Sequence, residues 1–142
     1  MMDVLIIDNS NALAPHIHGE GVFITVHDDE IRALRAVERA KPDIILLNYT
    51  VQSNDTAEFI ALLCRASEHS KIVLIALVLT DDEILDCLIA GAKGFLTIDE
   101  IPRFVNKLLP AVQAGEAWIS RRMVAKLIDK LRNQQVEYSV SP

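Results

Sequence analysis

The segment from Trp118 to Arg122 carries side chains whose types could bind a nucleotide. It reads Trp118-Ile119-Ser120-Arg121-Arg122, an aromatic plane followed by two guanidinium groups. An aromatic ring can stack on a base, and guanidinium groups can pair with phosphate. Trp118 could instead pack on the apolar stripe of the helix before it. We favour this structural role and keep the segment as a candidate ligand site or interface.

Histidines near the N-terminus raise the question of a metal site. His16 and His18 stand two residues apart, and His27 and Asp28 follow a few positions later. Imidazoles are common ligands of Zn²⁺ and Cu²⁺. Spacing alone is weak evidence, because histidines in a short loop are more often solvated. We therefore expect no metal and no cofactor.

The composition limits the classes of function. The chain has 142 residues, the length of one ordinary domain, and no apolar run reaches the roughly 18 residues of a membrane-spanning helix. Its net charge of −6 disfavours direct nucleic-acid binding, which requires a basic surface. Cys64 and Cys87 lie in apolar helical stretches without Cys-x-x-Cys spacing, so both are expected in the core of a cytoplasmic protein.

Continuous apolar runs alternate with helical patterns, which predicts an α/β fold with a doubly wound parallel sheet. The first connection, Ser10 to Gly21, contains Pro15, Gly19 and Gly21 and leaves room for about two helical turns. The predicted strands are Val4–Ile7, Val22–Val26, Ile44–Leu47, Ile72–Leu79 and Gly94–Thr97. The predicted helices are Asp29–Arg39, Thr56–Ala66, Asp82–Ala90 and Ile101–Val112.

The sequence divides into three parts. Residues 1–115 form the α/β domain. Residues 116–132 form an additional C-terminal helix, with Ser120 as its N-cap. Residues 133–142 are polar and are expected to begin an interdomain linker. The apolar face of the added helix comprises Met123, Val124, Leu127, Ile128 and Leu131.

Three segments together resemble the signatures of CheY-like receiver domains of two-component response regulators: Val4–Asn9, Lys41–Asn48 and Gly91–Leu96. The segment Ala114–Ser120 followed by a helix resembles the NarL/FixJ branch, whose receivers precede a LuxR-type helix-turn-helix domain. The resemblance implies a flavodoxin-like sheet of five strands in the order 2-1-3-4-5.

The resemblance also implies a pocket for aspartyl phosphorylation, and here that pocket is degenerate. Competent receivers gather Mg²⁺ with carboxylates at the ends of strands one and three and present one Asp as the nucleophile. The acceptor position is Asn48, an uncharged amide and a very poor nucleophile. The acidic pair is Asp8-Asn9, so one carboxylate remains where three are expected, and tight Mg²⁺ binding is not expected.

Other residues of the phosphorylation site that the resemblance implies are missing as well. The hydroxyl position falls on Ala76 and the lysine position on Ile98, while the switch aromatic is Phe95, without a hydroxyl. Because the nucleophile, the metal ligand, the hydroxyl and the cation are all absent, we infer that this site does not accept a phosphoryl group. We expect Asp8, Asn9 and Asn48 to hydrogen-bond one another; the alternative is a small-molecule effector in the altered pocket.

The resemblance therefore implies an atypical receiver domain, not an enzyme, that gives a transcription regulator phosphorylation-independent signal input or dimerisation. A homodimer is expected through the region Ile101–Leu131, with DNA contacted only by a domain outside this chain. A hydrolase using Asp8 is the competing enzyme hypothesis, and it lacks a recognisable base, nucleophile or metal site. Two further alternatives are a stand-alone protein-interaction adaptor and binding of cyclic di-GMP. The latter rests on Trp118-Ile119-Ser120-Arg121, which resembles the W-[F/L/M]-[T/S]-R motif of cyclic-di-GMP-sensing regulators.

Overall fold

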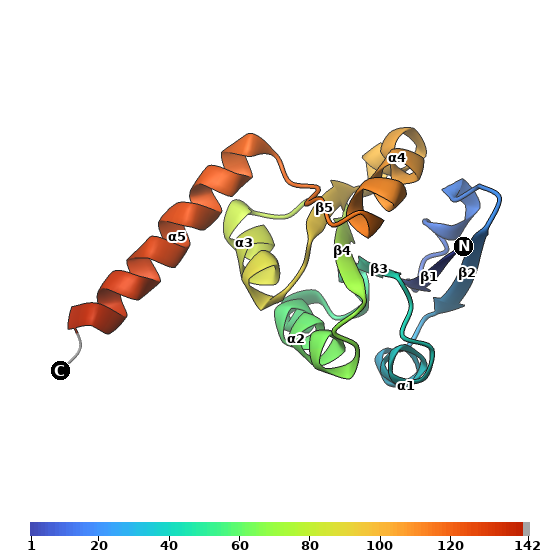
Figure 1. Ribbon diagram of the computed structural model, residues 1–142, viewed down its shortest axis with the longest axis horizontal. Helices are drawn as coiled ribbons and strands as arrows, with labels where there is room; N and C mark the ends of the chain where they lie inside the picture. The colour runs from blue at the N-terminus through green and yellow to red at the C-terminus, as the bar shows by residue number, and fades with distance from the viewer. Residues whose placement is uncertain (141–142) are drawn as a thin grey trace.

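The computed structural model describes residues 1–140, with side chains up to residue 134. Its centre is an all-parallel sheet with the strand order β2-β1-β3-β4-β5, which confirms the order expected from the resemblance (Figure 1). The strands are β1 (Met2–Ile7), β2 (Val22–His27), β3 (Ile44–Asn48), β4 (Lys71–Ala76) and β5 (Gly94–Thr97).

Helices cover both faces of this sheet (Figure 1). On one face α1, α2 and α3 pack over a cluster that includes Leu5 and Ile7. On the other face α4 packs over a cluster that includes Val4 and Ile6. Adjacent residues of β1 thus serve opposite cores, which explains why the strand is continuously apolar. The helices are α1 (Glu30–Ala40), α2 (Thr56–Ala66), α3 (Asp81–Ala90), α4 (Ile101–Gln113) and α5 (Arg121–Val140).

The first connection of the sheet contains no α-helix. Its only helical element among the described residues is a single 3-10 turn, Ala14–His16, shorter than the two turns expected from the sequence. The side chain of Asn106 on α4 holds this connection in place: its Nδ2 donates to the His16 carbonyl at 3.2 Å, and its Oδ1 accepts from the His18 amide at 3.2 Å. Leu13 and Ile17 fill the core beneath.

The fourth strand is shorter than predicted. The sequence indicated a strand from Ile72 to Leu79, but β4 ends at Ala76, opposite Thr97, the last residue of β5. Leu77 and Val78 are 59% and 83% exposed. Apolar character misled the prediction, because a strand without a neighbour to pair with cannot continue the sheet.

The C-terminal helix is longer than predicted, and the expectation that an interdomain linker begins at residue 133 stays a prediction. α5 continues to Val140, and Figure 1 shows it extending away from the rest of the molecule. The segment from 133 to 140 contains no Gly or Pro, and its Gln and Glu residues are good helix formers. Polar residues of this kind are compatible with a helix as well as with an irregular segment. The last two residues of the expected linker, 141–142, lie outside the described residues.

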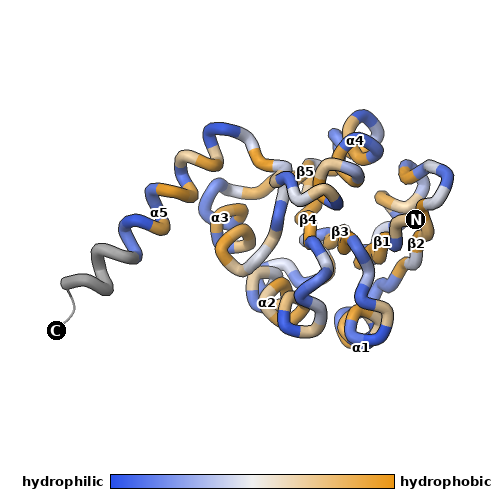
Figure 2. Tube along the Cα trace, in the orientation of Figure 1, coloured by the Kyte–Doolittle hydropathy of each residue, from blue (hydrophilic) through white to orange (hydrophobic). Residues whose placement is uncertain are grey.

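The apolar residues concentrate on the strands and on the inner sides of the helices (Figure 2). Cys87 on α3 is buried and Cys64 on α2 is half-buried, which confirms the expected core positions. Burial, with smaller contributions from Asp86 and Glu83, raises the pKa of Cys87 to about 11. None of the described helices combines the length and the hydropathy required to cross a membrane.

Two glycines with positive φ provide a test of the packing between α2 and α3. A Cβ on Gly91 (φ 133°) would lie 2.5 Å from Sγ of Cys64, whereas a Cβ on Gly115 (φ 96°) would meet no atom within 4 Å. We expect Gly115→Ala to cost about 1 kcal/mol of unfolding free energy through backbone strain, and Gly91→Ala roughly 1–3 kcal/mol more through overpacking. Urea denaturation of both variants measures the difference, and equal losses would contradict the close packing.

Candidate functional site

The candidate site lies where β1 and β3 end side by side. The two strands are parallel neighbours, so Asp8, directly after β1, and Asn48, the last residue of β3, reach the same edge of the sheet. Nδ2 of Asn48 donates a hydrogen bond to Oδ1 of Asp8 at 2.9 Å. Asp8 is 3% exposed and Asn48 is fully buried. The structure thus joins the expected acceptor position to the one remaining carboxylate.

The chain after Asp8 folds back over this carboxylate. Oδ1 accepts from the Ser10 amide at 3.0 Å and from the Ser10 hydroxyl at 2.8 Å, while Oδ2 accepts from the Ala12 amide at 2.9 Å. Asn11 has a φ of 56°, a conformation that Asn tolerates better than most residues, and this lets the segment turn. With Asn48, this makes four hydrogen bonds to one carboxylate, all of them from the chain itself.

These hydrogen bonds keep Asp8 ionised. Burial works to raise the pKa of the Asp8 carboxyl, but the bonds from Ser10, Asn48 and Ala12 favour the charged form and together lower the pKa from its ordinary value of 3.8. The single negative charge is therefore balanced by fixed N–H and O–H donors. Groups of the chain itself therefore compensate the charge of this buried carboxylate.

Thr50 completes the polar cluster on the other side of Asn48. Oδ1 of Asn48 accepts from the Thr50 amide and lies 3.1 Å from the Thr50 hydroxyl. The same hydroxyl is 2.9 Å from Oδ1 of Asn9, which brings the third expected residue into the cluster. Among the described residues, every buried polar side-chain atom has a hydrogen-bond partner. The pocket consequently offers no unsatisfied buried group for a ligand to bind.

The remaining pocket positions contribute apolar atoms. Ala76 ends β4 and is 2% exposed. Ile98 follows β5 and packs against the α4-side core, while Phe95 of β5 packs against the opposite core. None of these three side chains can donate or accept a strong hydrogen bond, or carry a charge, toward a phosphoryl group.

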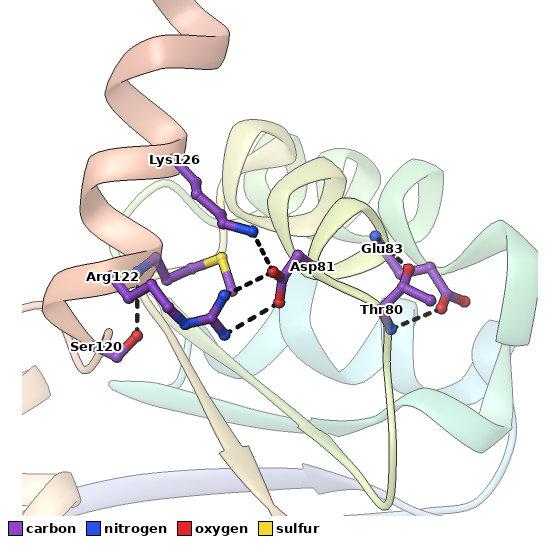
Figure 3. Close-up of polar contacts among 7 residues, drawn as sticks. Thr80, Asp81, Glu83, Ser120, Arg122 and Lys126 are labelled. Carbon is purple, nitrogen blue, oxygen red and sulfur yellow. Dashed lines mark hydrogen bonds and ion pairs between the residues drawn. The ribbon is translucent and has the colours of Figure 1, made fainter.

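Polar contacts lead from the site to α3. Tyr49, next to Asn48, donates its hydroxyl proton to Oε2 of Glu83 at 3.0 Å, and burial with the bond to Glu83 raises the pKa of Tyr49 to about 12. Oε1 of Glu83 accepts from the Thr80 amide at 2.9 Å and closes a capping box at the start of α3 (Figure 3). The end of β3 is thereby connected to the start of α3.

Trp118 lies beside the edge of the sheet. Its carbonyl accepts from the Phe95 amide and its amide donates to the Lys93 carbonyl, both at 3.0 Å. Its ring centroid is 6.4 Å from that of Phe104 on α4, at an interplanar angle of 50°. The ring therefore packs on the preceding helix. Ser120 caps α5 by accepting from the Met123 amide at 3.1 Å.

An ionic seam joins α3 to α5. Arg122 donates two hydrogen bonds to the Asp81 carboxylate, at 2.7 and 3.2 Å, and Nζ of Lys126 contacts the same carboxylate (Figure 3). Arg122 and Lys126 hold the pKa of Asp81 far below its ordinary value. Lys130 pairs with Asp86 at 2.9 Å. We call these three pairs the α3–α5 seam; the regular four-residue spacing of 122, 126 and 130 signalled it in the sequence.

A cavity of about 480 Å³ lies between α3, β5 and the start of α5. Trp118, Ser120 and Arg122 line it together with Phe95, whereas Arg121 is not among its lining residues and is exposed. The structure thus brings three of the four candidate interface residues around one space. Two of them are already engaged, because Arg122 pairs with Asp81 and Trp118 packs on Phe104.

Sequence reasoning missed Ser10, Ala12 and Thr50, which close the polar pocket. Ser10 and Thr50 left a signal, since small hydroxyl residues two or three positions after a strand end readily bond the neighbouring side chains. The role of a backbone amide such as that of Ala12 leaves no mark on residue type. Only the turn at Asn11 places it.

No family model matches the chain. In sequence it is similar to the transcriptional regulatory protein LiaR of Bacillus subtilis, at 23% identity over 105 residues, which is 74% of this chain and 50% of LiaR. It is also 25% identical over 100 residues to the DNA-binding transcriptional activator DevR/DosR of Mycobacterium tuberculosis, covering 70% and 46% of the two chains. The chain spans about half the length of the curated relatives it matches.

Several solved structures of response regulators and of their receiver domains have this fold. The isolated receiver domain of RcsB from Salmonella enterica superposes with a TM-score of 0.78 at 16% identity, covering 91% of this chain and 99% of that one. A LuxR-family response regulator from Aurantimonas gives a TM-score of 0.76 at 16% identity, with coverage of 91% and 96%. The receiver domain of NarL from Mycobacterium tuberculosis gives 0.68 at 24%, with coverage of 81% and 98%.

The sequence signatures, the parallel sheet in the order 2-1-3-4-5 and these similarities agree. The chain has the fold of response-regulator receiver domains and is similar in sequence to transcriptional regulators such as LiaR and DevR/DosR.

Proposed function

We propose that this chain is a response-regulator receiver domain of the LuxR/NarL type, and that it acts as a binding module, without aspartyl phosphorylation, in a transcription regulator. The observation that carries the proposal is the hydrogen bond from Asn48 to Asp8 at 2.9 Å. An amide at the acceptor position offers no anionic oxygen for phosphoryl transfer, and its N–H₂ group donates to the carboxylate that a cation would otherwise have to neutralise. The domain is therefore held in one conformation by its own hydrogen bonds.

The module transmits its state through contacts that do not involve phosphate. Tyr49 and Glu83 connect the pocket to the start of α3, and the α3–α5 seam fixes the C-terminal helix. A net charge of −6 makes this domain unsuited to contact DNA, so we assign DNA binding to a part of the regulator outside this chain. An effector would act by binding two arrangements of these contacts with different affinity.

The C-terminal helices support a homodimer. Met123 and Leu127 of α5 pack against the core. Val124, Ile128 and Leu131 follow the spacing i, i+4, i+7 on the helix and are 38%, 44% and 46% exposed. A helix that extends into solvent gains most of its stability from packing an apolar stripe, and a second protomer supplies the same stripe by two-fold symmetry.

Cyclic di-GMP binding is the weaker alternative. The cavity beside Trp118 has room for part of a nucleotide, but the Arg122 guanidinium group is committed to Asp81 and the Trp118 ring to Phe104. A ligand would have to replace both contacts. A stand-alone adaptor shares the binding role proposed here and differs only in lacking a DNA-binding partner domain.

Incubation with acetyl phosphate and Mg²⁺ tests the absence of phosphorylation. Intact mass spectrometry should show no adduct on the wild-type chain. The Asn48→Asp variant, which regains a carboxylate, serves as the comparison for the accessibility of the pocket. An adduct of about 80 Da on the wild type, one phosphoryl group, would contradict the proposal by showing that another residue accepts it.

Asn48→Asp should also reverse the pH dependence of stability. In the wild type the lowered pKa of Asp8 contributes stability above the ordinary pKa near 4, and that stability is lost as the pH falls through the folded-state value. In the variant two buried carboxyls share one site, so their folded-state pKa is raised and stability falls as the pH rises through it.

We therefore expect the Asn48→Asp variant to be more stable at pH 5 than at pH 7, by roughly 1–3 kcal/mol, and millimolar Mg²⁺ to recover the loss at pH 7. Urea denaturation at both pH values measures this. The exposed Asn133→Asp change is the matched control and should show neither effect. A variant with the wild-type pH profile would rule out the contact between the two side chains.

Light scattering after size exclusion tests the dimer. The wild type should have twice the monomer mass at high micromolar concentration, and the double variant Ile128→Glu with Leu131→Glu should be a monomer. Leu62→Glu on α2, which changes a residue of similar exposure (44%), should remain a dimer. A monomeric wild type, or a dimeric double variant, would refute dimerisation through α5.

A further inference from the structure

β2 leaves one edge of the sheet unprotected. It pairs only with β1, and Figure 1 shows it at the end of the sheet away from α5. The carbonyls of Gly21 and His27 accept from Met2 and Asp8, on the side of β1. Because backbone groups alternate along a strand, Ile24 and Val26 direct their N–H and C=O groups outward. These groups form a template for another strand.

Apolar side chains accompany these open backbone groups on both faces of β2. Ile24 and Val26 lie opposite Val4 and Ile6, on the face covered by α4, and are 36% and 46% exposed. Phe23 lies on the other face and is 53% exposed. On the α4 face, the connection between β1 and β2 contains a single 3-10 turn in place of a helix; Val22 packs against the core, but Ile24 and Val26 stay exposed.

The opposite edge of the sheet, formed by β5, is partly covered. The segment around Trp118 pairs with β5 through two backbone hydrogen bonds and shields that edge. Exposed edge strands are usually also blunted by charged residues or proline. β2 contains no Lys, Arg, Asp, Glu or Pro between Val22 and His27. Within the described part of the chain, β2 is thus the edge that remains open to pairing.

The charges around β2 indicate what would pair with it. Glu20 precedes the strand, Asp28, Asp29 and Glu30 follow it, and the first 31 residues contain no Lys or Arg. Two copies pairing through β2 would bring these acidic ends together, which is unfavourable. A strand with basic residues at both ends would meet opposite charge instead.

We propose that the β2 edge binds an extended segment of another protein, with alternating β-branched residues at its centre and basic residues at its ends. The segment adds to the sheet as a sixth strand. Main-chain hydrogen bonds to Ile24 and Val26 provide affinity, contacts with Phe23 provide apolar burial, and the acidic flanks select the charge. This surface is independent of the pocket at Asp8 and of α5.

The test uses a fluorescent probe peptide, Lys-Lys-Val-Thr-Val-Thr-Val-Lys-Lys, and the whole chain, with binding followed by anisotropy. Saturable binding is expected at low salt. A peptide with proline at its three central positions, or with glutamate in place of its lysines, should bind at least about tenfold more weakly. Equal binding of the proline peptide would overturn the proposal, as would the absence of saturable binding.

Ile24→Pro locates the site on the chain. It removes an outward N–H that the sheet does not use, a change that edge strands tolerate, and should weaken peptide binding about tenfold. Ile24→Val and Leu62→Val are the controls and should bind as the wild type does, and thermal unfolding verifies that each variant is folded. If Ile24→Pro instead lowers the mass of the free chain, a second copy occupies the edge and the proposed partner is wrong. If Ile24→Pro does not fold, the proline peptide decides whether main-chain hydrogen bonds carry the binding: weaker binding supports the proposal, and equal binding overturns it.

Discussion

The hydrogen bond between Asn48 and Asp8 is the contact on which the state of this domain depends. It joins two parallel strands at the edge of the sheet where receivers collect charge, and it does so with one negative charge and one neutral amide. A second carboxylate there would need a cation or a proton to lie so close. The amide removes that requirement, which supports the proposal that the site works without metal or phosphate. Ser10, Ala12 and Thr50 then satisfy the remaining polar atoms.

Hydrogen bonds and ion pairs connect this polar cluster to the helices α3 and α5. Tyr49 binds Glu83 at the start of α3, and Asp81 on the same turn binds Arg122 and Lys126 of α5. A capping box, the hydrogen bond from Tyr49 and the α3–α5 seam hold the start of α3. These exposed ion pairs are individually weak, and their value lies in fixing the direction of α5. The exposed apolar residues Val124, Ile128 and Leu131 of α5 thus have a defined orientation relative to α3.

Much of this arrangement could be predicted from sequence. Continuous apolar strands and the turn at Gly91 specify the parallel sheet, and the positions of Asp8, Asn9 and Asn48 follow from the strand ends. The end of β4 could not be predicted, because Leu77 and Val78 are as apolar as the residues of the strand before them. The length of α5 could not be predicted either, because its last residues are polar and such residues occur both in helices and in linkers. The enclosure of Asp8 depends on backbone amides and on the turn at Asn11, which residue types do not encode. The open edge of β2 became visible only once the first connection proved to lack a helix.

The most direct test of this account is an NMR titration of the ¹⁵N-labelled chain with beryllium fluoride and Mg²⁺, the phosphomimetic used with the RcsB receiver domain. The side-chain amide of Asn48 reports its bond to Asp8, and the backbone amides of Ser10, Ala12 and Thr50 report the surrounding bonds. The account predicts that these signals stay unchanged at millimolar reagent. Saturable shifts at Asn48 and Ser10 would show that the pocket opens to a metal and a phosphoryl mimic, and would contradict a receiver that is complete without them.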